Sequence, residues 1–237
     1  MKDSWIALFK DKKRLFLLAG LFLSGFLCTL IFSYFMVWNE GRQGLVLNDP
    51  VLSRIVARDL SLYTFLFTNV SIYTGLIITM RRPEGMFYVT VAAILICFMR
   101  IFTILSFPLE PPEGIIPLRD FLTEALFYQG SVMQKDLFFS GHTANIILVG
   151  LLLDKLWLKR TLMVIAGIVG ALLLVQHVHY TIDVLAAPFF AALAYKSSVF
   201  IVNRYFLADS DFNLRTGQIF EELGIKSPRT VSKELSH

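Results

Sequence analysis

Two histidines and an aspartate follow directly on one of the most apolar stretches of the chain. The segment "QHVHYTID" covers residues 176–183 and comes after "TLMVIAGIVGALLLV", which carries no charge. If a helix continued through this segment, His179 and Asp183 would lie on one face, one turn apart. The carboxylate could then accept a hydrogen bond from one imidazole nitrogen and fix the tautomer of the ring. The other nitrogen would be available to attack an electrophile or to take up a proton.

A second imidazole is found in "DLFFSGHT", residues 136–143. His142 would enter the same site from a neighbouring helix. Ser140 and Gly141 would form a small turn at the start of that helix, where backbone N–H groups favour an anion. Asp136 is either the N-cap of this helix or a member of the site.

Arg100 lies within the apolar run "CFMRIFTILSFP" and is a third candidate. A permanent cation in hydrocarbon is costly unless it meets a counter-charge, although Arg100 could also extend to the headgroup layer. Two imidazoles, a carboxylate, a helix N-terminus and a guanidinium together indicate a phosphoryl-transfer site that needs no metal.

Other interpretations of the same residues stay open. His179 and Asp183 could form an interface pair that only caps a helix, and the two histidines with the aspartate could bind zinc. His177 would point elsewhere on a helix, so we expect it to support the site or to lie at the interface.

The elements that must position these residues are membrane helices. The chain has 237 residues, of which 56% are hydrophobic and 17% are charged, whereas about a quarter of the residues in soluble domains are charged. The formal net charge of +4 comes from cations that flank apolar runs. This placement favours orientation in a bilayer over nucleic-acid binding.

A transmembrane helix needs about 20 mostly apolar residues. Six stretches meet this requirement, so the sequence predicts an all-α, polytopic membrane protein with six transmembrane helices. The predicted spans are about 15–38, 60–80, 86–107, 137–157, 161–179 and 184–206.

Charge predicts the orientation of these spans. Lys and Arg are concentrated before the first span, in the second and fourth connections and in the tail, which places those regions on the cytoplasmic side. The three remaining connections, including "HVHYTID", would face the outside or a lumen. We therefore predict a cytoplasmic N-terminal segment (1–14), a six-helix membrane catalytic domain (15–206) and a cytoplasmic C-terminal tail (207–237).

"SGHT" followed by "HYTID" resembles the phosphatidic acid phosphatase type 2 superfamily of six-span lipid phosphoryl enzymes. The resemblance implies the helical bundle of that superfamily. The chain departs from the usual pattern of the phosphatases, because several phosphate-binding cations are missing. The usual phosphatase pattern is Lys-x6-Arg-Pro, then Pro-Ser-Gly-His, then Ser-Arg-x5-His-x3-Asp. In this chain Arg100 and Phe107 take the places of the Lys and Arg of the first motif, and Phe139 takes the place of the proline in the second. Leu172 and Leu173 take the places of Ser-Arg in the third.

These departures resemble the sphingomyelin synthase branch, which has an aspartate before Phe-Ser-Gly-His-Thr and later His-x-His-Tyr-Thr-x-Asp. Both patterns are present, within a resemblance that covers about residues 60–195. The resemblance implies that His179 is the nucleophile and Asp183 its orienting group, and that His142 is first the acid and then the base. It implies substrate binding by a second set of residues: Arg100, Asp136, Ser140, Gly141 and Tyr180.

The expected activity is transfer of a phosphocholine- or phosphoethanolamine-type headgroup from a glycerophospholipid to a lipid alcohol such as ceramide. A diester carries less charge than a monoester, which fits the loss of cations. Carboxylates of the third connection could meet an amine headgroup, with Phe107, Phe127 or Tyr128 adding a cation–π contact. The alternatives are a lipid phosphate phosphatase and a non-catalytic lipid-binding protein. We expect membrane lipids as partners and no cofactor, metal or nucleic acid.

Overall fold

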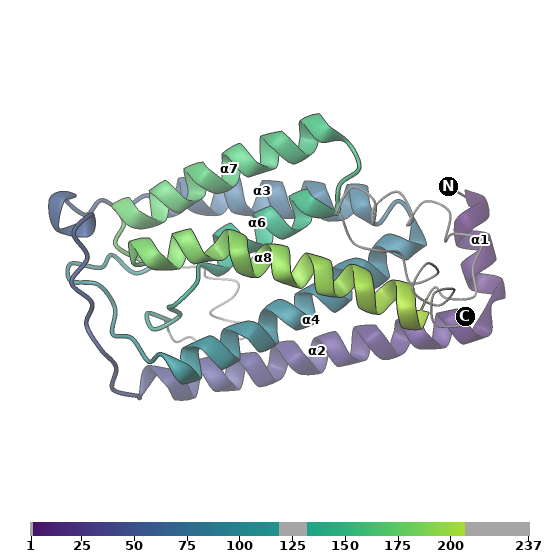
Figure 1. Cartoon of the computed structure of the whole chain (residues 1–237), viewed down its shortest axis with the longest axis horizontal. Helices are drawn as coiled ribbons and strands as arrows, with labels where there is room; N and C mark the ends of the chain where they lie inside the picture. The colour runs from purple at the N-terminus through teal and green to yellow at the C-terminus, as the bar shows by residue number, and fades with distance from the viewer. Residues whose placement is uncertain (1, 119–131, 207–237) are drawn as a thin grey trace, which may run out of the picture.

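The computed structural model describes residues 2–118 and 132–206, and the regular structure in these ranges is helical (Figure 1). Phe127, Tyr128 and the predicted tail, 207–237, lie outside the described residues. The long helices run roughly along one axis. The elements are α1 (Lys2–Lys10), α2 (Lys12–Glu40), the 3-10 helix η1 (Leu52–Arg54), α3 (Ser61–Thr79), α4 (Pro83–Ser106), α6 (Gly141–Leu152), α7 (Leu156–Val175), α8 (Thr181–Ile201) and the π-helix η2 (Val202–Phe206).

Within the described residues, five helices are long and apolar enough to cross a membrane, namely α2, α3, α4, α7 and α8 together with η2. The predicted fourth span, 137–157, is not such a helix in the structure. Its helical part is α6, which has 12 residues, fewer than the roughly 20 that a span requires. The difference arises because Ser140 caps α6 and the preceding residues, 132–140, are not helical.

The short helix α6 is the centre of the bundle and packs against α3, α4, α7 and α8. Most of its side chains are buried, including Ile146 and Val149. α3 approaches α6 closely, since a Cβ on Gly75 would overlap the side chain of Val149. Small residues at helix contacts of this kind are typical of packing inside membranes.

The outer helices present large apolar side chains on the surface of the bundle. α2 packs along α4 at the lower edge in Figure 1, and Phe16 on α2 is 79% exposed. In water such a surface would be an aggregation hazard, but in a bilayer it is a lipid contact. The apolar helices and their exposed surfaces are consistent with a multi-pass integral membrane protein.

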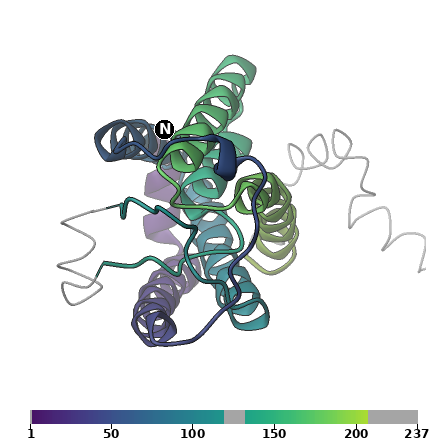
Figure 2. The ribbon, with the colours of Figure 1, turned by 90° about the vertical axis from the view of Figure 1, so that its left-hand side faces the viewer.

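Three connections meet at one end of the bundle, which faces the viewer in Figure 2. We call this region the loop end and define it as residues 41–60, 107–118, 132–140 and 176–180. An isolated β-bridge joins Leu45 to Leu109, and the Arg58 N–H donates to the carbonyl of Val175 at 3.1 Å. These contacts hold segments that are far apart in the sequence against one another.

The second and fourth connections lie at the opposite end, where Arg82 and Asp154 form an exposed ion pair of 3.0 Å. The chain therefore alternates between the two ends of the bundle, and it does so through α6 even though α6 is short. The alternation agrees with the predicted grouping of the connections.

Candidate active site

His179 and Asp183 are in contact, but not along a continuous helix as the sequence suggested. α7 ends at Val175, and α8 begins at Thr181 with Tyr180 as its N-cap. His179 lies just outside α8, and Asp183 occupies its first turn. The distance from His179 Nδ1 to Asp183 Oδ2 is 3.2 Å, and the two residues are only 3% and 0% exposed.

The Asp183 carboxylate is fixed by two backbone donors in addition to the imidazole. Its Oδ2 accepts from the N–H of Tyr180 at 3.1 Å, and its Oδ1 accepts from the N–H of Phe138 at 3.2 Å. Phe138 has a φ of 94°, which is strained for a residue with a side chain. The strained turn before α6 therefore also holds the carboxylate at the start of α8.

A carboxylate that the sequence analysis missed completes the start of α8. Asp49 accepts from the Thr181 N–H at 2.6 Å and from the Thr181 hydroxyl at 3.0 Å. Burial pushes the pKa of Asp49 up, but the hydrogen bonds from Thr181, Val51 and Leu52 together bring it below its ordinary value. The only local signal was an Asp-Pro turn, because Thr181 is 132 residues away in sequence.

Tyr180 has a structural position and does not line the cavity described below. Its side chain is 1% exposed, and its hydroxyl donates to the carbonyl of Glu110 at 3.0 Å. The same hydroxyl accepts from the Leu47 N–H at 3.2 Å. Tyr180 therefore links α8 to the two other connections of the loop end.

Ser140 is also structural. It is the N-cap of α6, with its hydroxyl accepting from the Thr143 N–H at 3.3 Å, and it is fully buried. The Ser140 N–H donates to the carbonyl of Asp183 at 3.0 Å, which joins the starts of α6 and α8. Ser140 thus takes the capping position that the sequence left open for Asp136.

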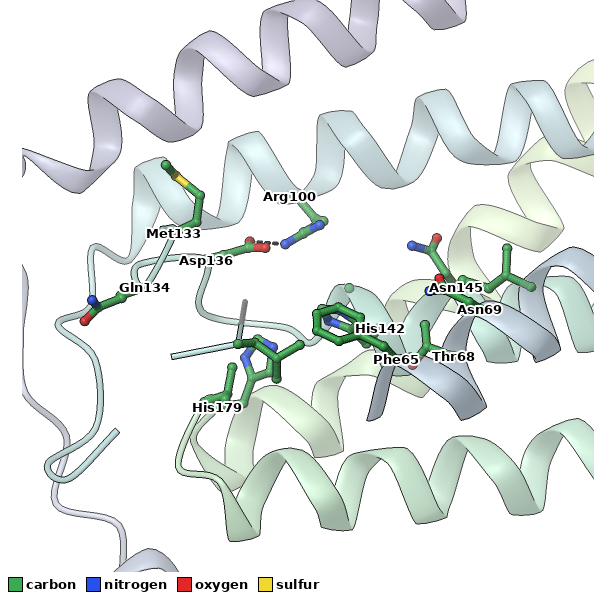
Figure 3. Close-up of a pocket in the computed structure, with 14 residues that line it drawn as sticks. Phe65, Thr68, Asn69, Arg100, Met133, Gln134, Asp136, His142, Asn145 and His179 are labelled. Atoms are coloured by element: carbon green, nitrogen blue, oxygen red, sulfur yellow. Dashed lines mark hydrogen bonds and ion pairs between the residues drawn. The ribbon is translucent and has the colours of Figure 1, made fainter. Parts of the chain in front are cut away.

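Asp136 instead provides the counter-charge for Arg100. A hydrogen-bonded ion pair joins Arg100 Nη2 to Asp136 Oδ1 (Figure 3). The guanidinium lies 4.9 Å from the ring centroid of Phe32. It also lies against the first turn of α6, because a Cβ on Gly141 would come within 2.5 Å of Arg100 Nη1. Glycine at this position lets the guanidinium lie directly against the helix.

One cavity of about 270 Å³ brings five of the predicted residues together. His142 and His179 both line it, and Figure 3 shows their side chains on neighbouring walls. The ring of His142 lies edge-on to Phe65 of α3, with centroids 6.1 Å apart. Asp183 stands behind His179 rather than on the cavity surface. The predicted residues on the wall are Arg100, Asp136, Gly141, His142 and His179.

The cavity also has polar walls that sequence reasoning missed. Thr68 and Asn69 of α3 and Asn145 of α6 line it beside Phe65. Their signal in the sequence is weak, since single polar residues in an apolar run are common. For Asn145 the spacing was informative, because it lies three residues after His142 on the same helix face.

His177 supports the loop end and does not line the cavity. Its Nδ1 lies 2.9 Å from the carbonyl oxygen of Glu113, and its Nε2 lies 3.0 Å from that of Ile55. A neutral imidazole has a single N–H, so only the imidazolium can donate to both carbonyls at once. This supporting position agrees with one of the two placements expected from the sequence.

The geometry suits nucleophilic catalysis at phosphorus. Asp183 engages Nδ1 of His179, which leaves Nε2 as the nitrogen available to a substrate. His142 can exchange a proton from another wall of the same cavity. Arg100 adds a cation that forms an ion pair with Asp136.

A comparison with known families finds a match over the part of the chain that holds these residues. Residues 135–200 match the family model described as "PAP2 superfamily C-terminal", a stretch that contains His142, His179 and Asp183. A search of curated proteins finds no match. Members of that superfamily are generally enzymes with phosphatase or phosphotransferase activity, and the matched stretch is similar to their C-terminal part.

Proposed function

We propose that the protein is a membrane lipid phosphotransferase of the sphingomyelin synthase type. It would move a phosphocholine- or phosphoethanolamine-type headgroup from a glycerophospholipid to a lipid alcohol such as ceramide. The observation that carries the proposal is the placement of His142 and His179 on one cavity, with Asp183 on the far nitrogen of His179.

The first half of the reaction forms a phosphohistidine. Nε2 of His179 attacks phosphorus, and the bond from phosphorus to the diacylglycerol oxygen breaks. His142, as the imidazolium, gives its proton to that oxygen, so that neutral diacylglycerol leaves. Asp183 stabilises the positive charge that develops on the His179 ring.

The second half transfers the headgroup. The hydroxyl of the lipid alcohol attacks phosphorus while the now neutral His142 removes its proton. The bond from nitrogen to phosphorus breaks, and both histidines return to their starting states. Water in place of the alcohol would make the protein a lipid phosphatase, which is the second candidate because it uses the same residues and the same superfamily match.

The charge of the cavity favours a diester substrate. Among the described residues that line the cavity, Arg100 is the one Lys or Arg, and Asp136 balances its charge. A phosphate monoester with about two negative charges would need more cations than a diester with one. The Asp136 carboxylate could in addition attract a cationic headgroup, since Asp136 lines the same cavity.

The decisive experiment uses purified protein in vesicles that contain a glycerophospholipid donor and fluorescent ceramide. We expect a fluorescent phospho-ceramide product together with one diacylglycerol per turnover, and no product from His179→Ala. If only inorganic or headgroup phosphate appears, water is the acceptor and the phosphatase alternative is correct.

We also propose that the loop end faces the extracytoplasmic or lumenal side, with both termini in the cytoplasm. The basic residues of the opposite end support this orientation, among them Arg81, Arg82 and Lys159. A cysteine at the exposed loop residue Val56 should react with a membrane-impermeant maleimide in intact cells, whereas one at Trp157 should not. The reverse labelling pattern would invert the orientation.

A further inference from the structure

The cavity extends past His142 to a group of polar side chains on α3 and α6 (Figure 3). Thr68 lines the cavity and is 4% exposed, and among the described residues its buried hydroxyl has no hydrogen-bond partner. Asn69 and Asn145 line the same region, and within residues 2–118 and 132–206 neither side-chain amide has a hydrogen-bond partner. We call these three residues the amide subsite.

Unpartnered polar groups in a membrane protein carry a free-energy cost. A threonine in a helix commonly avoids this cost by donating to the carbonyl four residues earlier, as Thr29 and Thr79 do here at 3.0 and 2.8 Å. Thr68 does not make this bond. Thr68 differs from Thr64, whose hydroxyl is unpartnered too, because Thr68 lines the cavity, where a ligand could supply the missing hydrogen bond.

The amide subsite stands in a fixed relation to the reacting groups. Asn145 follows His142 by three residues on α6, so it lies on the same face about 4.5 Å further along the axis. Asn69 reaches the cavity from α3, which packs against α6. In Figure 3 Asn69, Thr68 and Asn145 lie on the opposite side of His142 from His179. If the reacting oxygen of a lipid lies at His142, the lipid atoms two or three bonds away from that oxygen lie near these side chains.

We propose that Thr68, Asn69 and Asn145 bind the polar backbone of the acceptor lipid and select an alcohol that carries an amide next to its reacting hydroxyl. The inference rests on the proposed transferase function. A primary amide and a hydroxyl offer both donors and acceptors, and an amide-bearing alcohol such as ceramide offers both in return. A diacylglycerol backbone offers ester carbonyls, which only accept.

The subsite is separated from the charged part of the cavity. Arg100 and Asp136 lie where the phosphate and headgroup would be bound, whereas the amide subsite is uncharged. Changes in the subsite should therefore alter recognition of the acceptor and leave recognition of the donor unchanged.

The test compares Asn145→Leu, Asn69→Leu and Thr68→Val with wild type in vesicles. We expect KM for fluorescent ceramide to rise about tenfold in Asn145→Leu, as loss of hydrogen bonds predicts, with KM for the donor unchanged within about twofold. Thr64→Val is the matched control, because its hydroxyl is also buried on α3 without a partner but does not line the cavity. It should leave both constants unchanged.

Two outcomes of this kinetic test would overturn the proposal. Unchanged KM for ceramide in all three variants would mean that water fills the subsite, and a rise in the donor KM alone would assign the subsite to the glycerolipid. Binding of photoreactive ceramide to the inactive His179→Ala protein, with and without Asn145→Leu, separates this inference from the proposed function. About tenfold weaker labelling in the double variant would support the subsite even if no headgroup were transferred, and equal labelling would refute it.

Discussion

The starts of α6 and α8 each hold one of the two histidines, but they are built differently. At α8, backbone and carboxylate groups bond to one another in a closed set: Asp49 to Thr181, Asp183 to Tyr180, and Asp183 to Phe138. At α6, the start is open to the cavity, and the guanidinium of Arg100 lies against Gly141.

The difference corresponds to the chemistry proposed for each histidine. His179 must present one nitrogen in a fixed direction and tautomer, and its surroundings are almost closed to solvent. His142 must exchange a proton with two successive lipid oxygens, and its side chain is partly exposed on the cavity. We call the start of α8, which holds the proposed nucleophile His179, the rigid start. We call the start of α6, which holds the proposed acid and base His142, the open start. Four changes test this comparison.

Asp183→Asn should have the largest effect, because it breaks the rigid start at its centre. An amide in place of the carboxylate would support the wrong tautomer of His179 and could not stabilise the imidazolium. We expect turnover to fall about a thousandfold, measured as headgroup transfer to fluorescent ceramide. Unchanged size-exclusion behaviour should accompany the loss, and near-normal turnover would remove the orienting role of Asp183.

His142→Ala acts on the open start and should have the next largest effect. Loss of a general acid and base typically costs about a hundredfold or more. Both halves of the reaction should slow, so a burst of diacylglycerol release should not be seen in rapid-quench measurements. An unaffected enzyme would mean that another group supplies the proton.

Gly141→Ala should displace Arg100 without touching either histidine. The added Cβ would lie 2.5 Å from Arg100 Nη1, so the flexible end of Arg100 must shift relative to Asp136. We expect KM for the phospholipid donor to rise about tenfold, as loss of a charged hydrogen bond predicts. Gly167→Ala is the control, because nothing lies within 4 Å of a Cβ there, and a similar effect in both variants would refute the reasoning.

The pH dependence of the unfolding temperature should give the smallest effect. It concerns Glu110, whose backbone carbonyl accepts a hydrogen bond from Tyr180 at the start of α8. The hydrogen bond from Lys135, followed by that from the Gly44 N–H, lowers the pKa of Glu110 below its ordinary value of 4.5. The folded state therefore gains stability from the carboxylate above that value and loses it as the pH falls through the lowered pKa. Thermal unfolding of wild type should drop more steeply with acidification than that of Glu110→Gln, and parallel curves would contradict this.

The sequence predicted the all-helical class and located most spans, because long apolar runs are a local signal. It overestimated α6, since a hydropathy pattern extends through 137–157 while the helix begins only at Gly141. The backbone turn at Phe138 that delays the helix depends on Asp183, 45 residues later. No local pattern contains that partner.

The site was predicted in part for a similar reason. The spacing of His179 and Asp183 suggested their contact, but the contact is made across a helix start that depends on Asp49, far away in sequence. Tyr180 and Ser140 were expected from motif positions, and in the structure both are buried and do not line the cavity. The polar side chains of Thr68, Asn69 and Asn145 became visible only when α3 and α6 were placed together.

The bridge between Leu45 and Leu109 has a consequence for hydrogen exchange. Connections between membrane helices usually exchange their amide hydrogens quickly, because their N–H groups bond to water. Here the amides of Leu45, Glu110 and Ile116 donate to backbone carbonyls of other segments. Deuterium uptake at these positions should thus be slow, and it should become fast together when any one of the segments is released.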